Sequence, residues 1–261
     1  MDNYSSNYLA FTLRIYTNEV FFCFNYYCLK VKGEYIKKIG LVTAVEIASV
    51  MKKYADSLVK EEVKGFDVYS IDFRDKIMYV AQSGVGEIRA AACTQMLISR
   101  FDVDLVVNFG VVGALRDEIK LLNSCIVGKI VHYDMDTSAV DNCEVGRYLE
   151  YDDIYLRTTK KYVEMAIKHN PNMRVVTCAS ADKFVVDAEK KKEIAGLFDA
   201  DICDMESAGI ILVCDKNKVP NLFIKTISDS IQGGRAEFRE YMEKAADTCI
   251  DIINSIIVNM K

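Results

Sequence analysis

From residue 35 onward, short runs of β-branched residues alternate with longer stretches in which apolar residues recur at helical spacing. This alternation is typical of a mostly parallel sheet covered by helices. The β-branched runs predict strands at 36–42, 66–73, 76–82, 105–109, 124–132, 174–179, 200–204 and 221–228. The helical spacing predicts helices at 44–60, 87–100, 158–169, 188–197, 207–216 and 236–259. The pattern therefore indicates an α/β fold with a large sheet.

The last predicted helix carries the clearest periodicity. Its apolar residues keep close to a 3.6-residue period; they are Phe238, Tyr241, Met242, Ala245, Ala246, Cys249, Ile252, Ile253, Ile256 and Ile257. We expect this helix to close the domain by packing on the sheet. By contrast, the stretch 134–153 has no clear period, and long loops of this kind often carry function.

Composition narrows the class of protein. A chain of 261 residues that is 51% hydrophobic can bury one large core. The formal net charge is -5 with scattered Lys and Arg, so there is no basic stripe for nucleic acid. No apolar run reaches the roughly 18 to 20 residues of a membrane helix. The nine cysteines lie mostly in apolar runs and indicate reduced thiols of a cytoplasmic protein.

Residues 1–35 form an N-terminal extension of a different character, rich in Tyr, Phe and Asn. Arg14 and Glu19 interrupt what would otherwise resemble the apolar core of an export signal. The extension is either a native segment or the product of a gene start placed too far upstream. We therefore expect the functional domain to span 36–261.

Two glycine-containing segments follow predicted strands. Ser83-Gly84-Val85-Gly86 precedes a helix, and Asn108-Phe-Gly110-Val-Val-Gly113 forms a second expected turn. Glycines at such places let a ligand approach the backbone, although a plain strand-to-helix turn uses the same residues. The chain has neither the dinucleotide pattern Gly-x-Gly-x-x-Gly nor a phosphate loop, so no cofactor is predicted. With only two histidines, it offers no metal site either.

Acidic residues end two further strands. Asp204-Met205-Glu206-Ser207 lies at a strand-to-helix junction, where these side chains could simply cap the helix. Asp229 ends the last strand, within Lys225-Thr-Ile-Ser228-Asp-Ser. An isolated Asp there is usually a turn residue, but a buried strand can also deliver it to a site as a general acid.

Taken in order, Ser83-Gly-Val-Gly, Asn108-Phe-Gly-Val-Val-Gly, Ser180-Ala-Asp-Lys-Phe-Val, Asp204-Met-Glu and Ile227-Ser-Asp resemble the motifs of the purine nucleoside phosphorylase and nucleosidase superfamily. Within it, the chain is most similar to 5'-methylthioadenosine/S-adenosylhomocysteine nucleosidases. The resemblance covers residues 37–261. It implies a single α/β domain, with a mixed central sheet flanked by helices in three layers, that cleaves the N-glycosidic bond of a purine nucleoside.

The resemblance also implies roles on the base side of the site. Asp229 would protonate the purine at N7, and Ser228 would orient Asp229. Phe184 would stack on the base while the backbone of Val185 reads the purine edge. A strand-end aromatic is otherwise more often part of the core, which is the alternative for Phe184.

On the sugar side, the resemblance implies that Glu206 holds the ribose hydroxyls and that Met205 packs beneath the sugar. Ser83 and Gly84 would line the nucleophile side. Lys225 stands where the family has an arginine beside the sugar. Lysine keeps the charge but loses the bidentate fork.

The nucleophile is less fully specified. Related phosphorylases hold phosphate with arginines, one of them at the position of Asn108, and a dianion without guanidinium partners is poorly held. Water is therefore expected. Nucleosidases activate it with a glutamate, but an ungapped match places Ala48 there, and Glu46 lies two residues earlier. Glu46, the remaining candidate for the catalytic glutamate, either reaches the site through a shortened loop or faces solvent at the start of a helix, and the solvent-facing position is the expectation.

The favoured function is hydrolysis of a 5'-substituted adenosine. The segment His132-Tyr-Asp134-Met-Asp136 resembles the family's loop at the subunit interface, which implies a homodimer. Two alternatives stay open. The protein could be a phosphorylase or a nucleosidase for another purine, or a nucleoside-binding protein that lost turnover with its water-activating residue.

Overall fold

The computed structural model describes residues 12–16, 19–24, 27–31 and 35–260. The chain divides into two compact units, one made of Met1–Tyr35 with Lys261 and the other of Ile36–Met260. In the first unit, β1 (Thr12–Tyr16), β2 (Glu19–Phe24) and β3 (Tyr27–Val31) form an antiparallel three-stranded sheet in the order β1-β2-β3. Arg14 and Glu19 lie in these strands. The site described below lies entirely in the second unit.

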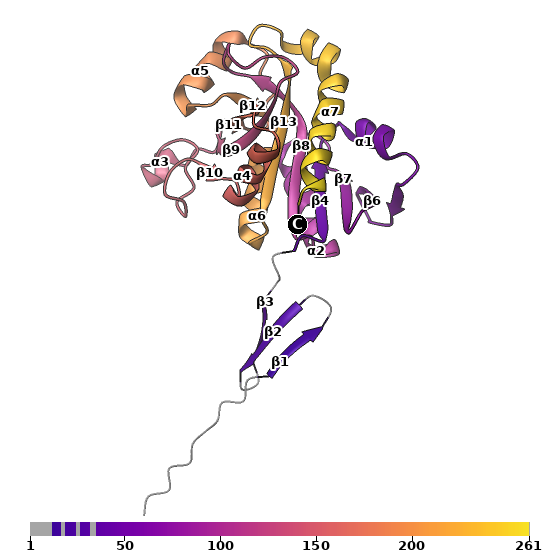
Figure 1. Cartoon of the computed structure of the whole chain (residues 1–261). Helices are drawn as coiled ribbons and strands as arrows, with labels where there is room; N and C mark the ends of the chain where they lie inside the picture. The colour runs from indigo at the N-terminus through magenta and orange to yellow at the C-terminus, as the bar shows by residue number, and fades with distance from the viewer. Residues whose placement is uncertain (1–11, 17–18, 25–26, 32–34, 261) are drawn as a thin grey trace, which may run out of the picture. The chain divides into compact units, whose positions relative to one another are not determined.

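The second unit is built on a ten-stranded mixed sheet (Figure 1). Its strands are β4 (Lys38–Thr43), β5 (Val59–Glu61), β6 (Asp67–Phe73), β7 (Lys76–Gln82), β8 (Leu105–Ala114), β9 (Ser124–His132), β10 (Leu156–Arg157), β11 (Arg174–Ser180), β12 (Ile202–Asp204) and β13 (Asn221–Asp229). The order is β10-β9-β11-β12-β8-β4-β7-β6-β5, and β13 pairs with both β8 and β9. The pairings among β8, β12, β11, β9 and β13 therefore close into a ring.

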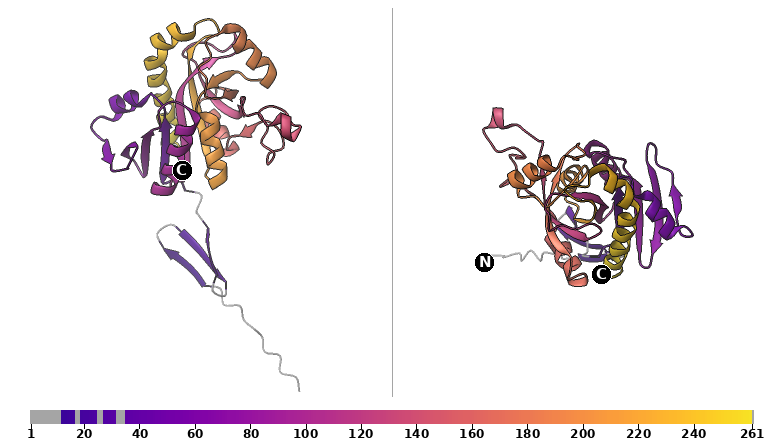
Figure 2. Two further views of the ribbon diagram at one scale, coloured as in Figure 1. Left: turned by 180° about the vertical axis from the view of Figure 1, so that it is seen from behind. Right: turned by 90° about the horizontal axis from the view of Figure 1, so that it is seen from above.

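Helices cover this sheet on both faces. They are α1 (Ile47–Tyr54), α2 (Glu87–Phe101), α3 (Ser138–Asp141), α4 (Lys160–His169), α5 (Ala188–Phe198), α6 (Ser207–Asn217) and α7 (Gly234–Val258). Buried side chains of α2 and α6 share one apolar cluster with the sheet, and those of α1, α4 and α7 share another. Figure 2 shows α3 and the β6 edge at opposite ends of the unit. The predicted α/β domain with a mixed central sheet flanked by helices is confirmed.

The C-terminal helix packs as its periodicity predicts over most of its length. Ala245, Ala246, Cys249, Ile253 and Ile257 are almost fully buried. The first turns differ, because Phe238, Tyr241 and Met242 are only half-buried. Phe238 and Met242 line a cavity instead of the core.

Two predicted elements, and in part the stretch 134–153, differ from the structure. The helix predicted at 44–60 is only α1, because residues 44–46 turn around the Glu46 carboxylate and β-branched Val59 begins β5, which pairs with β6. The strand predicted at 105–109 runs on to Ala114, so Gly110 and Gly113 lie inside β8 rather than in a turn. The 134–153 stretch is mostly irregular but contains the one-turn α3. No helix among the described residues is both long and apolar enough to cross a bilayer.

Candidate active site

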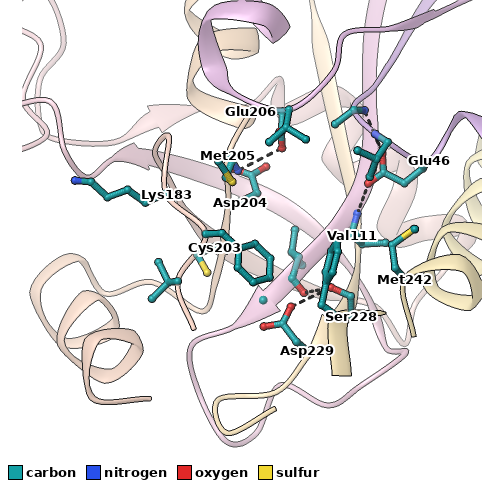
Figure 3. A pocket seen from close by; sticks show the side chains of 18 residues that line it. Glu46, Val111, Lys183, Cys203, Asp204, Met205, Glu206, Ser228, Asp229 and Met242 are labelled. Atoms are coloured by element: carbon teal, nitrogen blue, oxygen red, sulfur yellow. Dashed lines mark hydrogen bonds between the residues drawn. The ribbon is translucent and has the colours of Figure 1, made fainter. Parts of the chain in front are cut away.

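A cavity of about 420 Å³ opens where several strands end in the second unit. Its walls come from the loop after β4, from β8, from the segments after β11 and β12, from the end of β13 and from α7 (Figure 3). The acidic side chains on these walls are Glu46, Asp204, Glu206 and Asp229. Three sequence segments that are far apart in the chain thus bring four carboxylates to one cavity.

Asp229 lies at the end of β13 and is 2% exposed. Its Oδ2 accepts a hydrogen bond from Lys191 Nζ at 2.6 Å, and the Ser228 hydroxyl lies 3.1 Å from its Oδ1. Lys191 comes from α5 and is fully buried. A Cβ on Gly113 would lie 3.0 Å from Asp229 Oδ2, so glycine at this place in β8 makes room for the carboxyl group.

Glu206 occupies the opposite wall, at the start of α6. Its Oε1 accepts a hydrogen bond from the Gly86 amide at 3.0 Å, and its Oε2 lies 3.3 Å from the Met205 amide. Burial, reinforced by the nearby charge of Asp204, raises the pKa of Glu206 to about 7. Glu206 is therefore a carboxyl group that changes charge near neutral pH.

Asp204 is the partner of the second buried lysine. Lys225 Nζ lies 2.7 Å from its Oδ2, and the hydroxyl groups of Ser180 and Ser207 also donate to it. Burial pushes the pKa of Asp204 upward, but Lys225 and these hydrogen bonds hold it below its ordinary value. Burial likewise opposes the charge of Lys225, yet Asp204 raises the pKa of that lysine.

Glu46 lies inside the cavity wall, 4% exposed. Its Oε2 accepts hydrogen bonds from the Thr43 hydroxyl and from the amides of Ala44 and Val45, at 2.8, 3.1 and 2.9 Å. Its Oε1 accepts one bond, from the Val111 amide at 2.9 Å. A carboxylate oxygen has two lone pairs, so Oε1 keeps one for a further donor.

The expectation that Glu46 faces solvent at a helix start is therefore wrong. The tight turn after β4 folds around this carboxylate and directs it inward. Ala48, the residue that the ungapped match aligns with the family's glutamate, is exposed on α1. A Cβ on Gly110 would lie 3.0 Å from Glu46 Oε1, so the second glycine of β8 makes room for Glu46 as Gly113 does for Asp229.

The structure brings together Phe184, Val185, Met205 and Ser228 along the cavity, as predicted from the motifs. Phe184 is 47% exposed rather than part of the core, and its ring meets the edge of Phe238 at a centroid distance of 5.2 Å. Phe238 and Met242 were expected only as core residues of the last helix. Their position shows that the first turns of α7 cover the cavity.

Three predicted binding residues do not line the cavity. Ser83 and Gly84 lie beside Val85, which does. The Ser83 hydroxyl lies 3.2 Å from the Thr43 carbonyl and 2.8 Å from that of Gly84, and Gly84 adopts a φ of +77°. Lys225 is 1% exposed and lies behind Asp204. The charge of Lys225 therefore supports the wall instead of facing the cavity.

Two residues at the site were not predicted to act there. Asp204 was given no role of its own beyond its place in the Asp204-Met-Glu motif and a possible helix cap, and it does lie 3.3 Å from the Ser207 amide. Lys191 sits in the run Lys190-Lys191-Lys192, which has the appearance of a solvated surface. The sequence does indicate its burial, because Ile194 and Phe198 follow it by three and seven residues. That spacing places all three side chains on the same buried face of α5.

Three lysines at or behind the cavity wall are paired with aspartates. Lys191 and Lys225 hold Asp229 and Asp204, and Lys183 Nζ at the rim lies 3.1 Å from Asp134 Oδ2. None of the described residues that line the cavity is an arginine. The lining therefore offers no guanidinium to an anion, and the Arg89 side chain lies outside it, beside Gly84.

Similar proteins share this architecture. A solved structure of 5'-methylthioadenosine/S-adenosylhomocysteine nucleosidase from Helicobacter pylori, with butyl-thio-DADMe-Immucillin-A, superposes with a TM-score of 0.81 at 27% identity and covers 86% of this chain and 99% of its own. Aminodeoxyfutalosine nucleosidase from Campylobacter jejuni is 28% identical over 207 residues, 77% of this chain and 89% of its own length. The Shewanella loihica 5'-methylthioadenosine/S-adenosylhomocysteine nucleosidase is 25% identical over 231 residues, 85% and 100% of the two chains.

The sequence model of the Phosphorylase superfamily matches residues 38–258. That range begins with β4 and ends with α7, so it contains every wall of the cavity. The superfamily that the five motifs indicate is confirmed, and the chain belongs to the phosphorylase superfamily.

Proposed function

We propose that this protein hydrolyses the N-glycosidic bond of a 5'-substituted adenosine and releases adenine. The observation that carries the proposal is the placement of Asp229, Glu206 and Glu46 around one cavity without an arginine. The names of the similar proteins support it, because they are nucleosidases for 5'-methylthioadenosine/S-adenosylhomocysteine or for aminodeoxyfutalosine.

Cleavage of a glycosidic bond to nitrogen needs a neutral leaving group. Asp229 at the end of β13 would donate a proton to N7 of the adenine, with Ser228 fixing its second oxygen. Phe184 and Val185 on the loop after β11 would hold the base beside Asp229. The electrons of the broken bond then stay on the protonated base.

The sugar gains positive charge as the bond breaks. Glu206 would accept hydrogen bonds from the ribose hydroxyls, and its negative charge stabilises an oxocarbenium-like sugar. Met205 lies next to it on the same wall. Glu46 would accept a proton from the attacking water through Oε1, the oxygen that has a lone pair left.

The charges around the cavity favour water over phosphate as the nucleophile. A phosphate dianion needs charge-assisted donors, preferably arginines. The lysines near the cavity are paired with aspartates, and two of them lie behind its wall. A dianion beside Glu46 and Glu206 would be repelled.

The deciding experiment measures adenine release from 5'-methylthioadenosine and from aminodeoxyfutalosine by the purified protein, with and without inorganic phosphate. Release that does not depend on phosphate is expected. Strict dependence on phosphate would instead indicate a phosphorylase. Tight binding without release would indicate a nucleoside-binding homologue.

We also propose that the protein acts as a homodimer in the cytoplasm. The seven cysteines whose side chains are described are free thiols, which fits a reducing compartment. Val85, which lines the cavity, and Ile88 in the first turn of α2 expose 44% and 81% of their surface, where a second subunit could cover them. Sedimentation of the purified protein should give the mass of a dimer, and a monomer would contradict this part of the proposal.

A further inference from the structure

A fully buried lysine holds the carboxyl group that is proposed to protonate the base. Lys191 Nζ donates to Asp229 Oδ2 at 2.6 Å and to the Ser230 carbonyl at 2.7 Å. Its side chain has 0% exposure and that of Asp229 has 3%. Burying a lysine costs free energy unless the lysine is paired. Packing alone therefore does not explain why Lys191, the middle of three consecutive lysines, points inward.

The pair creates a difficulty for the proposed acid. A carboxyl group that accepts a hydrogen bond from an ammonium group is most stable as the carboxylate, which has no proton to donate. The proton closest to Asp229 is then the one on Lys191 Nζ. A short hydrogen bond between the two groups is the path along which that proton can move.

Resting on the proposed function, we propose that Lys191 is the proton reservoir for Asp229, and that the two residues act as one acid. A proton moves from Nζ to the Asp229 carboxylate, leaving a neutral amine. Asp229 then donates its proton to N7 as the glycosidic bond breaks, and the bonding electrons go to the base. The amine regains a proton from solvent after adenine leaves. Lys191 is thus a positioning and proton-supplying residue that does not touch the substrate.

Other ionisable groups face the pair from neighbouring elements. Cys203 on β12 is the nearest thiol, and burial raises its pKa to about 12 although Lys191 opposes this effect. Asp204 on the same strand is held by Lys225. Glu237 in the first turn of α7 accepts from the Ser230 amide at 2.7 Å. The thiol stays neutral and both acids have their own donors, so Lys191 remains the proton source.

The test compares Lys191→Met, Lys191→Gln and Lys191→Arg in the full-length protein, with Lys190→Met as a control on the exposed face of the same helix. The readouts are kcat and KM against pH, adenine affinity and thermal unfolding. Arginine keeps the charge and a donor but does not release a proton in proteins. We expect Lys191→Arg to lower kcat by about 100-fold at every pH, the size of a general-acid effect. Lys190→Met should behave as the wild type.

Methionine and glutamine should give a different profile. Without the cation, the buried carboxyl group of Asp229 binds its own proton, so both variants should keep substantial kcat in acid. Their activity should disappear at a lower pH than that of the wild type, because no lysine replaces the lost proton. If Lys191→Met does not fold, Lys191→Gln, which keeps hydrogen-bond donors, carries the same expectation.

The inference is overturned if Lys191→Arg retains kcat within about threefold of the wild type, since Lys191 then acts only through its charge. It is also overturned if the alkaline limb of Lys191→Met or Lys191→Gln coincides with that of the wild type. These outcomes are distinct from failure of the proposed function, in which the wild type itself releases no adenine without phosphate.

Discussion

At the scale of single residues, the carboxyl groups around the cavity differ because their partners differ. Asp229 and Asp204 each have a buried lysine, Glu46 has four backbone or hydroxyl donors, and Glu206 has only amides. Burial, with the charge of Asp204 nearby, raises the pKa of Glu206 to about 7. Chemically similar side chains thus lie in different environments around one cavity.

Glu206 gives a prediction for the pH dependence of binding. Above a pH of about 7 the group is ionised and accepts hydrogen bonds strongly, and below it the group is neutral. The affinity for a non-hydrolysable adenosine analogue should therefore fall as pH decreases through this value, which calorimetry at a series of pH values would measure. Glu206→Gln should bind more weakly and without this dependence. The same pH slope in the variant would show that another group is responsible.

Glu46 and Ala48 give a second prediction. Glu46→Gln should lower kcat by about 100-fold or more, the size of a general-base effect, with little change in adenine affinity. Thermal unfolding should also shift, because the new amide opposes one of the amides that now donate to the carboxylate. Adding Ala48→Glu should not restore turnover, since that position is exposed. Restored activity would place the water activator at position 48.

The ordered motifs predict most of the residues that line the cavity, although Ser83 and Gly84 of the first motif lie beside it. Asp229, Glu206, Met205, Phe184 and Val185 all reach the cavity. The position of Glu46 depends on how a three-residue turn closes around its carboxylate. The periodicity of apolar residues does not predict such a turn. The burial of Lys191 depends on a contact with β13, a strand that begins thirty residues later in the chain.

At the scale of elements, β8 is the strand that sets the geometry of the site. Its Gly110 faces Glu46 and its Gly113 faces Asp229. In the sequence these glycines predict a turn, because glycine usually breaks strands. Within a strand, however, glycine also marks a place where another group approaches closely, and this is their role here.

Gly113→Ala tests this role. The new Cβ would lie 3.0 Å from Asp229 Oδ2 and 3.2 Å from Cys203 Sγ, so the acid must shift. We expect kcat to fall while far-ultraviolet circular dichroism is unchanged. The matched control is Gly196→Ala on the exposed face of α5, where a Cβ meets nothing within 4 Å. Alanine there should stabilise the protein by roughly 0.5–1 kcal/mol in urea unfolding. Equal kcat for Gly113→Ala and the wild type would show that the glycine of β8 does not set the position of Asp229.

Elements with strong periodicity were predictable, and those fixed by pairing were not. The helices α2, α5, α6 and α7 and most strands appear close to their predicted bounds. The short β5 and β10 exist only because β6 and β9 offer them an edge. The ring closes because β13 pairs with both β8 and β9. The pattern of apolar residues along the chain predicts strands but not their partners.

At the scale of the whole molecule, every described residue of the cavity and of the three apolar clusters belongs to the unit Ile36–Met260. A chain that begins at Ile36 after an initiator Met is therefore expected to fold and to keep the kcat/KM of the full-length protein within about twofold. The measurement is adenine release, together with the midpoint of thermal unfolding. A large loss of either would show that residues 1–35 contribute to the catalytic unit.

The two glycines of β8 have a consequence for how specificity can change over time. They let the backbone of one strand, rather than flexible side chains, set the spacing between Asp229, the proposed acid, and Glu46, the proposed water activator. The apolar walls, such as Val45, Phe238 and Met242, come from other elements. If the proposed function holds, replacements in those walls are expected to alter which 5' group is accepted while Asp229 and Glu46 keep their positions. This separation between walls and reacting groups would allow one ancestor to give rise to proteins with different substrates. The similar proteins named for methylthioadenosine and for aminodeoxyfutalosine fit that expectation.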